Sequence, residues 1–388
     1  MTDQQKGIIK LCIDKGACSI ADFSKALNIS IPTATKLLGE LVSQGYLAEM
    51  GKVGTSGGRR PNTFGLNPEA GYFLGVDVAR QHFHIAISDF SGEVKFFLQD
   101  IEFVLEASAE SFRTMSRKIK EVVNEAGLEW SKILGVGISL TGRVNPEKGF
   151  SLSYFVSDDI QLGDIFQREL EAPVNIENDS RAMTYGEYCG LGNEADPNML
   201  FINLSWGLGM GMILDGKLYY GTSGFSGEFG HFPLLDNNVM CRCGKIGCLE
   251  TGASGSGRTH WIKQQLQQGR RSSLSSIYKR DGDISLQNVL DAVEDEDVLA
   301  IEGIGAMGDT LGRGIAGLIN IFNPGLVVIG GRLIVGKDYL MLPIRTAVNR
   351  YSLSKVSADT KIKSSQLGRS AAAIGDCLLS RSKYLSNL

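Results

Sequence analysis

Most of this chain of 388 residues is built from two rounds of the same order of strand-like and helix-like segments. In the first round, tight turns join three strand-like runs, at 72–79, 83–90 and 94–102, and helical and strand-like segments alternate after them. The second round begins with two apolar runs, at 199–204 and 210–214, which predict a hairpin. Antiparallel strands that lead into alternating strands and helices predict an α/β domain of two related lobes, and ligands bind between such lobes.

The first 70 residues follow a different pattern and carry a different charge. They hold eight Lys and Arg against six Asp and Glu, a balance of +2, so the other 318 residues must carry −6 to give the net charge of −4. The Gly- and Ser-rich stretch 51–62 comes just before the first strand of the large segment. These shifts predict two domains, 1–70 and 71–388. Within the second domain we expect a first lobe at about 71–182 with a C-terminal helix at 369–385, and a second lobe at about 183–368.

Three short helical patterns precede the Gly-rich stretch. The first covers residues 4–14, Ser19 is a good N-cap for the second, and Pro32 fits the first turn of the third. Two short strands around a Gly-rich tip would complete a winged helix-turn-helix, whose third helix enters the major groove of DNA. The residues predicted to contact DNA lie on the polar face of the third helix and at the tip: Thr33, Thr35, Lys36, Arg59 and Arg60. The alternative is a small helical module that binds protein.

Three of the seven cysteines, Cys241, Cys243 and Cys248, lie within eight residues, and His231 precedes the first by ten positions. Three thiolates and one imidazole complete the tetrahedral set that structural zinc prefers, and no position is left for a catalytic water. We therefore expect these four residues to hold a structural Zn²⁺ ion. The alternative is three free cysteines in a surface loop.

The same region resembles the signature of the ROK family, which is named for repressors, open reading frames and kinases. The resemblance is carried by Gly-Glu-Phe-Gly-His at 227–231 and by Cys-x-Cys-Gly-x-x-Gly-Cys-Leu-Glu at 241–250, and it extends over nearly the whole chain. It implies a two-lobed α/β fold of the sugar kinase/actin-like ATPase (ribonuclease H-like) type. It also implies that Glu228, His231 and Glu250 hold sugar hydroxyls, with the other ring nitrogen of His231 on the zinc.

The tripeptide Glu177-Asn178-Asp179 resembles a second motif of the family, in which the Asp is the general base of the kinases. This resemblance adds Asn178 and Asp179 to the expected sugar site. The match ends after the carboxylate, because Ser180-Arg181-Ala182 departs from the family pattern. A winged helix at the N-terminus is what separates the sugar-responsive repressors of the family from its shorter kinases.

Both phosphate-binding loops of the family's kinases are altered in this chain. The first, a D-x-G-G-T-K hairpin, reads Asp-Val-Ala-Arg-Gln-His at 77–82 and lacks the glycines, the Thr and the Lys. The second, G-T-G-x-G, reads Ser-Trp-Gly-Leu-Gly at 205–209 and holds the bulky Trp206. Phosphoryl transfer depends on positioning and on charge stabilisation. We therefore expect no enzyme activity, and Asp179 would be a vestigial base.

These observations predict a sugar-responsive transcriptional repressor of carbohydrate-use genes, which binds operator DNA and a sugar or a sugar phosphate. Paired winged helices in a homodimer or homotetramer would match a symmetric operator. The alternatives are an ATP-dependent sugar kinase with an added DNA-binding domain, and an adaptor whose first module docks protein. The chain has no run of eighteen apolar residues and no signal-peptide pattern, so we expect a cytoplasmic protein without membrane contact.

Two further patterns have ordinary structural interpretations. Gly303-x-Gly305-x-x-Gly308 matches a dinucleotide-binding fingerprint in its letters, but it lies in a helical stretch rather than after a strand, so we expect a helix. The acidic run 291–297 is expected to form a solvated turn.

Overall fold

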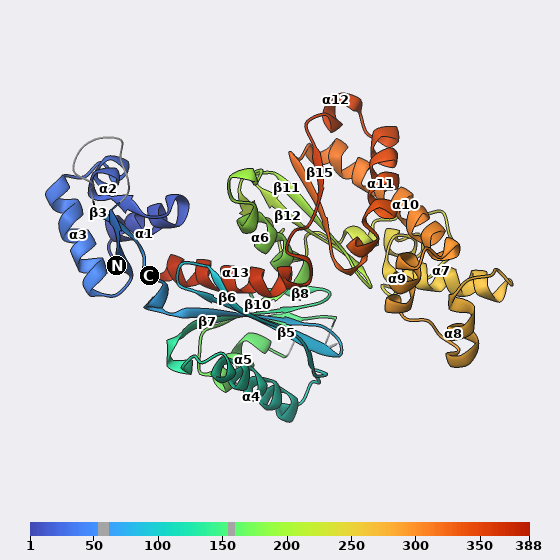
Figure 1. Ribbon diagram of the computed structural model, residues 1–388, viewed down its shortest axis with the longest axis horizontal. Helices are drawn as coiled ribbons and strands as arrows, with labels where there is room; N and C mark the ends of the chain where they lie inside the picture. The colour runs from blue at the N-terminus through green and yellow to red at the C-terminus, as the bar shows by residue number, and fades with distance from the viewer. Residues whose placement is uncertain (53–61, 154–159) are drawn as a thin grey trace. The chain divides into compact units, whose positions relative to one another are not determined.

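The computed structural model describes residues 1–52, 62–153 and 160–388 (Figure 1). Contacts group the chain into two compact units. Unit 1 comprises Met1–Leu140, Lys148–Glu177 and Ala373–Leu388, and unit 2 comprises Thr141–Glu147 and Asn178–Ala372. Because unit 1 includes the N-terminal module (residues 1–70) together with the first large sheet, this division does not test the domain limits given above, which stay predictions.

The N-terminal module folds as three helices and a three-stranded sheet in the order β1-β3-β2. Each helix begins at a side-chain cap: Thr2 and Ser19 form capping boxes, and Ser30 accepts the amide of Thr33. Asn28 ends the second helix in the left-handed conformation, which asparagine tolerates. This is the winged helix-turn-helix order expected from the sequence. Its elements are α1 (Asp3–Lys15), β1 (Cys18–Ser19), α2 (Ile20–Leu27), α3 (Ile31–Ser43), β2 (Leu47–Lys52) and β3 (Asn62–Leu66).

Aromatic rings pack the N-terminal module against the rest of unit 1. The ring centroid of Phe90 lies 5.9 Å from that of Tyr46 and 6.4 Å from that of Tyr384. The two chain ends also meet here, since the amino group of Met1 donates to the carbonyl of Leu388 at 2.9 Å. These rings belong to the same buried cluster as the helix cores of the module. The module is therefore a packed part of unit 1.

The main sheet of unit 1 has five strands in the order β10-β7-β4-β5-β6. Strands β4, β5 and β6 are antiparallel neighbours, and β4 runs parallel to β7. Helices α4 and α5 cover one face, and α13 lies along the other (Figure 1). Gly75 and Gly137 admit α13, because a Cβ atom at either position would collide with its backbone. The elements are β4 (Tyr72–Val78), β5 (His82–Asp89), β6 (Val94–Glu102), α4 (Ala109–Glu125), β7 (Ile133–Leu140), β9 (Phe150–Ser151), α5 (Leu162–Leu170), β10 (Val174–Asn178) and α13 (Ala371–Asn387).

Unit 2 repeats this plan in a sheet of order β13-β12-β11-β14-β15. Three strands are antiparallel neighbours, and β11, β14 and β15 run parallel. The expected repetition of strands and helices is thus confirmed. The elements are β8 (Val144–Asn145), α6 (Asp179–Leu191), β11 (Met199–Leu204), β12 (Leu208–Leu214), β13 (Lys217–Leu218), α7 (Gly255–Gln267), α8 (Leu274–Asp281), α9 (Leu286–Glu294), α10 (Val298–Phe322), β14 (Leu326–Gly330), α11 (Lys337–Tyr351), α12 (Ser354–Ser357) and β15 (Lys361–Ser364).

Helix α10 contains the Gly303-x-Gly305-x-x-Gly308 sequence, so the expectation of a helix rather than a nucleotide-binding turn is confirmed. Its glycines serve packing: a Cβ atom at Gly308 would lie 2.7 Å from the carbonyl oxygen of Leu340 in α11. Although α10 runs for 25 residues, no helix in the described part of the chain has the length and apolar character that a membrane crossing requires.

The expectation of a solvated turn at 291–297 is right only in part: residues 295–296 form an exposed turn, while the rest of the run belongs to two helix ends. Asp291 and Glu294 belong to the last turns of α9. Asp297 is the N-cap of α10, where its carboxylate accepts the amide of Ala300 at 3.0 Å and that of Ser273 at 2.7 Å. The acidic residues therefore end one helix and begin the next.

Two glycines of α10 form a matched pair for testing its packing on α11. A Cβ atom at Gly312 would lie 2.6 Å from the carbonyl oxygen of Ile344, whereas one at Gly317 would meet nothing within 4 Å. We expect Gly317→Ala to raise the free energy of unfolding by about 0.5–1 kcal/mol through helix propensity. Gly312→Ala should lower it by about 1–3 kcal/mol, because α11 must move away. Denaturant unfolding of both variants measures the difference, and equal effects would contradict this packing.

Candidate functional site

The cysteine loop lies in unit 2 between two short 3-10 turns, Phe229–His231 and Leu249–Thr251. Hydrogen bonds fold the loop back on itself: the amide of Cys241 donates to Lys245 O at 2.8 Å, and that of Gly244 donates to Cys241 O at 2.9 Å. Gly244 has a φ of +81°, a conformation that L-residues rarely adopt. This local fold brings the three thiols to one side.

The four residues predicted to bind metal converge. Their ligand atoms, from His231, Cys241, Cys243 and Cys248, all lie within 4.8 Å of one another. Sγ of Cys243 is 3.6 Å from Sγ of Cys248, and Sγ of Cys241 is 3.6 Å from Nδ1 of His231. A disulfide would need about 2.05 Å. Around a tetrahedral zinc ion, with bonds of ~2.3 Å to sulfur and ~2.0 Å to nitrogen, neighbouring ligand atoms lie ~3.8 and ~3.5 Å apart. The four side chains fit such an ion.

Electrostatics favours a cation among these thiols. Burial raises the pKa of the Cys241 thiol, and burial together with the neighbouring thiols raises that of Cys248. Three thiols this close do not all ionise on their own, because each thiolate repels the next. A divalent cation removes that repulsion and deprotonates the thiols. The cluster could therefore hold a metal ion.

His231 connects the thiols to the carboxylate of Glu228. Its Nδ1 faces Cys241, while its Nε2 lies 3.6 Å from Oε2 of Glu228. A metal at Nδ1 would leave Nε2 to carry the ring hydrogen, which makes it a donor of fixed direction. The His231 and Glu228 side chains are 34% and 41% exposed, so a dissolved ligand can reach both.

Glu250 belongs to the same cluster. Its Oε2 accepts the amide of Leu208 at 3.0 Å, and its Oε1 lies 3.9 Å from Sγ of Cys241. Its negative charge also acts on Glu228. The structure thus brings together Glu228, His231 and Glu250, the three side chains that the family signature assigns to a sugar.

Asn178 and Asp179 stand at the start of helix α6. Asn178 is its N-cap, since Oδ1 accepts the amide of Arg181 at 3.1 Å, while Nδ2 donates to Gly142 O at 2.8 Å and to Asp179 Oδ1 at 2.9 Å. Asp179 also accepts the amide of Ser180 at 2.7 Å. Asn178 therefore shapes the site and aligns the Asp179 carboxylate. Contact of either residue with a sugar stays a prediction.

Burial raises the pKa values of two carboxyl groups of the site, Asp179 and Glu228. Asp179 keeps some exposed surface, but its carboxyl group is enclosed. For Glu228 the positive charges of His231 and Arg143 oppose the rise, and the negative charge of Glu250 adds to it. Carboxylates accept hydrogen bonds from hydroxyls, and a protonated carboxyl donates one. Such a set suits a polyhydroxylated ligand.

The two loops that resemble the phosphate loops of the family's kinases make hydrogen bonds and ring contacts within this chain. The hairpin turn at 79–82 is closed by a hydrogen bond from the amide of Ala79 to His82 O at 2.9 Å. In the turn between β11 and β12, the ring of Trp206 lies 6.0 Å from the guanidinium of Arg242. Two residues further on, where β12 begins, the amide of Leu208 donates to the Glu250 carboxylate. A backbone amide that could face a phosphate is therefore already bonded.

Sequence reasoning noted Arg181 and Trp206 only as departures from family motifs and did not foresee their contacts at this site. Arg181 is only 3% exposed and donates to backbone carbonyls of two loops. Trp206 is 39% exposed and packs on the cysteine loop through Arg242. Each stands where the sequence departs from a family motif, and that departure is the signal that could have found it.

The helix residues predicted to bind DNA lie on the accessible side of α3. Thr35 and Lys36 are exposed and Thr33 is half-buried, with the Lys36 side chain 77% exposed. The leucines of the same helix face the core of the module. Arg59 and Arg60, predicted at the tip between β2 and β3, lie outside the described residues.

A second histidine cluster in unit 1 does not suit a metal. His82, His84 and Asp100 lie close enough together to be candidate ligands. However, Nδ1 of His84 accepts the amide of Asp100 at 3.0 Å. A neutral ring that accepts through Nδ1 carries its hydrogen on Nε2, so neither nitrogen has a lone pair for a metal. We place no metal there.

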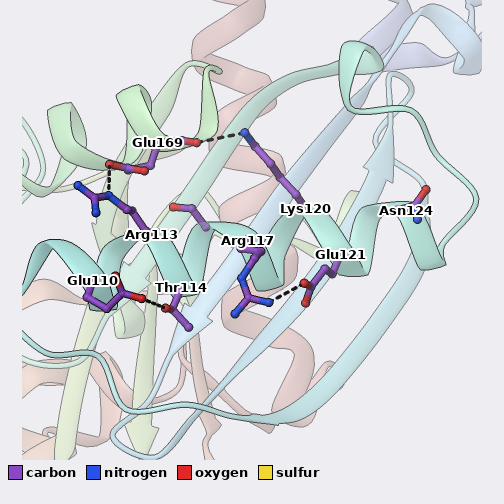
Figure 2. A pocket seen from close by; sticks show the side chains of 9 residues that line it. Glu110, Arg113, Thr114, Arg117, Lys120, Glu121, Asn124 and Glu169 are labelled. Atoms are coloured by element: carbon purple, nitrogen blue, oxygen red, sulfur yellow. Dashed lines mark hydrogen bonds and ion pairs between the residues drawn. The ribbon is translucent and has the colours of Figure 1, made fainter.

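A hollow of about 580 Å³ on the outer side of α4 is lined by charged residues that pair with one another (Figure 2). Arg113 lies 3.9 Å from Glu169, and Arg117 lies 2.9 Å from Glu121. Lys120 donates to the backbone carbonyl of Glu169 at 3.1 Å. None of the predicted site residues lines this hollow, which is a solvated helix face.

The sequence was compared with family models and with known proteins. A model of the ROK family matches residues 73–383. The chain is similar to a xylose repressor of Caldicellulosiruptor bescii, with 30% identity over 98% of this chain and 95% of the relative. It is also similar to the DNA-binding transcriptional dual regulator NagC of Escherichia coli, with 24% identity over 96% of this chain and 91% of the relative.

Solved structures give the same result. A ROK family transcriptional regulator, a homologue of the E. coli MLC protein, matches with a TM-score of 0.83 and 28% identity over 98% of this chain and 97% of its own. A ROK family glucokinase from Streptomyces griseus, in complex with glucose and AMPPNP, matches with a TM-score of 0.68 and 25% identity over 80% of this chain and 100% of its own. The expected fold class is confirmed. Because the family model covers well over half of its residues, the chain belongs to the ROK family.

Proposed function

We propose that this protein is a sugar-responsive transcriptional repressor that controls genes of carbohydrate use. The observation that carries the proposal is the position of His231, which has one ring nitrogen at the thiols and the other beside Glu228. The same chain carries a winged helix-turn-helix module. Similarity to a xylose repressor over 98% of the chain supports the assignment, because that alignment includes most of the module.

The effector is a sugar or a sugar phosphate. Its hydroxyls would be held by Glu228, His231 and Glu250, with Asp179 and Asn178 completing the site. The matched glucokinase was solved with glucose, and other relatives are named for xylose and N-acetylglucosamine, which supports a carbohydrate ligand. The carboxyl groups of Asp179 and Glu228, whose pKa values are raised by burial, and an oriented imidazole supply both acceptors and donors for hydroxyls.

The metal is a structural Zn²⁺ ion held by His231, Cys241, Cys243 and Cys248. Three sulfur ligands and one nitrogen at tetrahedral spacing favour zinc over the harder cations. When bound, the ion supplies charge and rigidity, with no open position for a reacting water. The role of the chain is to fix the His231 ring so that Nε2 points at the effector.

The protein binds sugar without phosphorylating it. The Asp179 carboxylate is present, but the turn that would cradle phosphate carries Trp206, and its Leu208 amide is bonded to Glu250. A base alone supplies a small part of phosphoryl-transfer catalysis, which rests on positioning and charge stabilisation. These contacts support a sensor rather than a kinase.

Operator DNA would be bound by α3 in the major groove. Thr33, Thr35 and Lys36 occupy the accessible face near the N-terminus of that helix, where base edges are met. One such module contacts few base pairs, so a homodimer or homotetramer would place two modules on the half-sites of a symmetric operator.

The zinc proposal is tested by Cys243→Ser, with Cys189→Ser, at an exposed cysteine of the same unit, as control. We expect Cys243→Ser to destabilise the protein by a few kcal/mol, because zinc binding contributes directly to folding. In the wild type we expect at least one sugar of a panel (D-xylose, D-glucose, N-acetylglucosamine and their phosphates) to raise the melting temperature. Cys243→Ser should abolish this effect, since His231 serves both the zinc site and the effector site. Thermal unfolding with and without each sugar measures both effects. An unchanged melting temperature together with an unchanged sugar response would contradict the shared role of His231.

The DNA-binding surface is tested by Lys36→Ala, with Lys10→Ala on the first helix as control. Loss of one phosphate contact should weaken binding evenly across sequences and lower the slope of log K against log[salt] by about one unit. Fluorescence anisotropy with a duplex selected by the protein from a random pool gives this slope. If the protein selects no duplex, or if both variants match the wild type, α3 is not the DNA-binding helix and the adaptor alternative gains support.

A further inference from the structure

A short segment of unit 2, Thr141–Glu147, lies in the sequence between two segments that belong to unit 1. We call this segment the strap. Three hydrogen bonds of 2.8, 3.0 and 3.1 Å tie it to the rest of unit 2, and they run from Asn178 to Gly142 O, from Arg181 to Val144 O and from Asn145 to Ser223 O. The strap therefore keeps its place in unit 2 through side chains that lie at the proposed effector site or next to it.

The second element is the loop at 219–227, which leads directly into Glu228; we call it the approach loop. It lies against the strap, because a Cβ atom at Gly224 would be 2.7 Å from Cδ of Pro146. At its other end Gly227 has a φ of +88° and lies against the carbonyl of Met210. Since Glu228 is the next residue, a shift of the approach loop moves the carboxylate.

Arg181 reaches both elements from helix α6. Its Nη1 donates to Gly224 O in the approach loop at 2.7 Å, and its Nη2 donates to Val144 O in the strap at 3.0 Å. The guanidinium also lies 5.5 Å from the ring centroid of Tyr220. A buried cation held by two backbone carbonyls and an aromatic face fixes the separation of the segments that carry those carbonyls.

We propose that Arg181 is a positioning residue of the effector site, which sets the place of the Glu228 carboxylate by clamping the approach loop to the strap. This inference rests on the proposed function, because it concerns how the same site is shaped. Arg181 needs no contact with the effector. Its position, two residues after Asp179, also ties the clamp to the helix start that holds that carboxylate.

The chemistry of the clamp requires a guanidinium. Two carbonyls from separate segments are met by two nitrogens of one planar group, whereas an ammonium has a single nitrogen and a different reach. Arg181→Lys keeps the charge and loses the fork, and Arg181→Met loses both. If position matters more than charge, the lysine variant should resemble the methionine variant in effector affinity.

A double-mutant cycle on the full-length protein tests the clamp. The probe is whichever of D-xylose, D-glucose and N-acetylglucosamine most stabilises the wild type, and its affinity is measured by calorimetry. We expect Arg181→Met and Glu228→Gln each to weaken binding roughly tenfold or more. The double variant should bind little more weakly than either single variant, because a carboxylate that is already out of place contributes little binding that Glu228→Gln could remove. Combined with Glu250→Gln, by contrast, the factors should multiply, since Glu250 is anchored separately by the amide of Leu208.

The matched control is Arg258→Met in helix α7. Arg258 is the same residue type in the same unit, is 9% exposed, and also lies over an aromatic ring, 5.5 Å from the centroid of Trp261. We expect this variant to lose stability without losing effector affinity. If Arg181→Met fails to fold, Arg181→Lys and Asn145→Ala replace it in the cycle, because Asn145 makes the other bond between the strap and the approach loop.

The outcomes separate the clamp from the proposed function. A wild type that responds to no sugar on the panel would overturn the sugar-sensor assignment and the clamp with it. A responsive wild type whose Arg181 variants bind with unchanged affinity would overturn the clamp alone. Losses that multiply with Glu228→Gln as fully as with Glu250→Gln would also overturn it, because they would show a general effect on stability.

Discussion

One imidazole ring joins the proposed metal site of this protein to its proposed effector site. His231 turns Nδ1 to a group of three thiols and Nε2 to a carboxylate that is open to solvent, so its orientation would be shared between the proposed metal site and the proposed ligand site. A histidine ring has a single plane, and fixing one nitrogen fixes the direction of the other. The surrounding loops hold the ring in this orientation. Short turns lie on either side of the cysteine loop, and Gly244 within it has a left-handed conformation. The Glu250 carboxylate lies near the Cys241 thiol and accepts the amide of Leu208 at the start of β12.

The chain shares its fold with a ROK family glucokinase, while the turn between β11 and β12 makes contacts of its own. Two sheets of the same strand order form the two units, as in a fold that supports phosphoryl transfer in relatives of this protein. Yet Leu208 gives its amide to Glu250, and Trp206 stacks near Arg242. On the proposed function, the side chains expected to hold a sugar are present, while the two loops that resemble kinase phosphate loops depart from the family pattern. This contrast between the two sets of residues supports a sugar-binding protein with an attached DNA-binding module.

Much of this organisation was predictable from local sequence. The strands expected at 94–102 and 199–204 match the structure residue for residue, because turn residues bound each run. Ser19 caps a helix as expected, and the four residues predicted to bind metal converge. The turn expected at 291–297 covers only 295–296, because the acidic residues on either side of it end α9 and cap α10. The departure from the family motif marks Arg181, but its partners could not be predicted from sequence, since they are backbone carbonyls 37 and 43 residues away.

We propose that sugar and operator DNA bind different parts of this protein and act on the same conformational equilibrium. Thermodynamic linkage then requires that the factor by which sugar changes operator affinity equals the factor by which operator changes sugar affinity. The direct measurement is a pair of titrations: operator affinity with and without saturating sugar, and sugar affinity with and without saturating operator. The account predicts the same factor, different from one, in both directions. Equal sugar affinity in the presence and absence of saturating operator would contradict it.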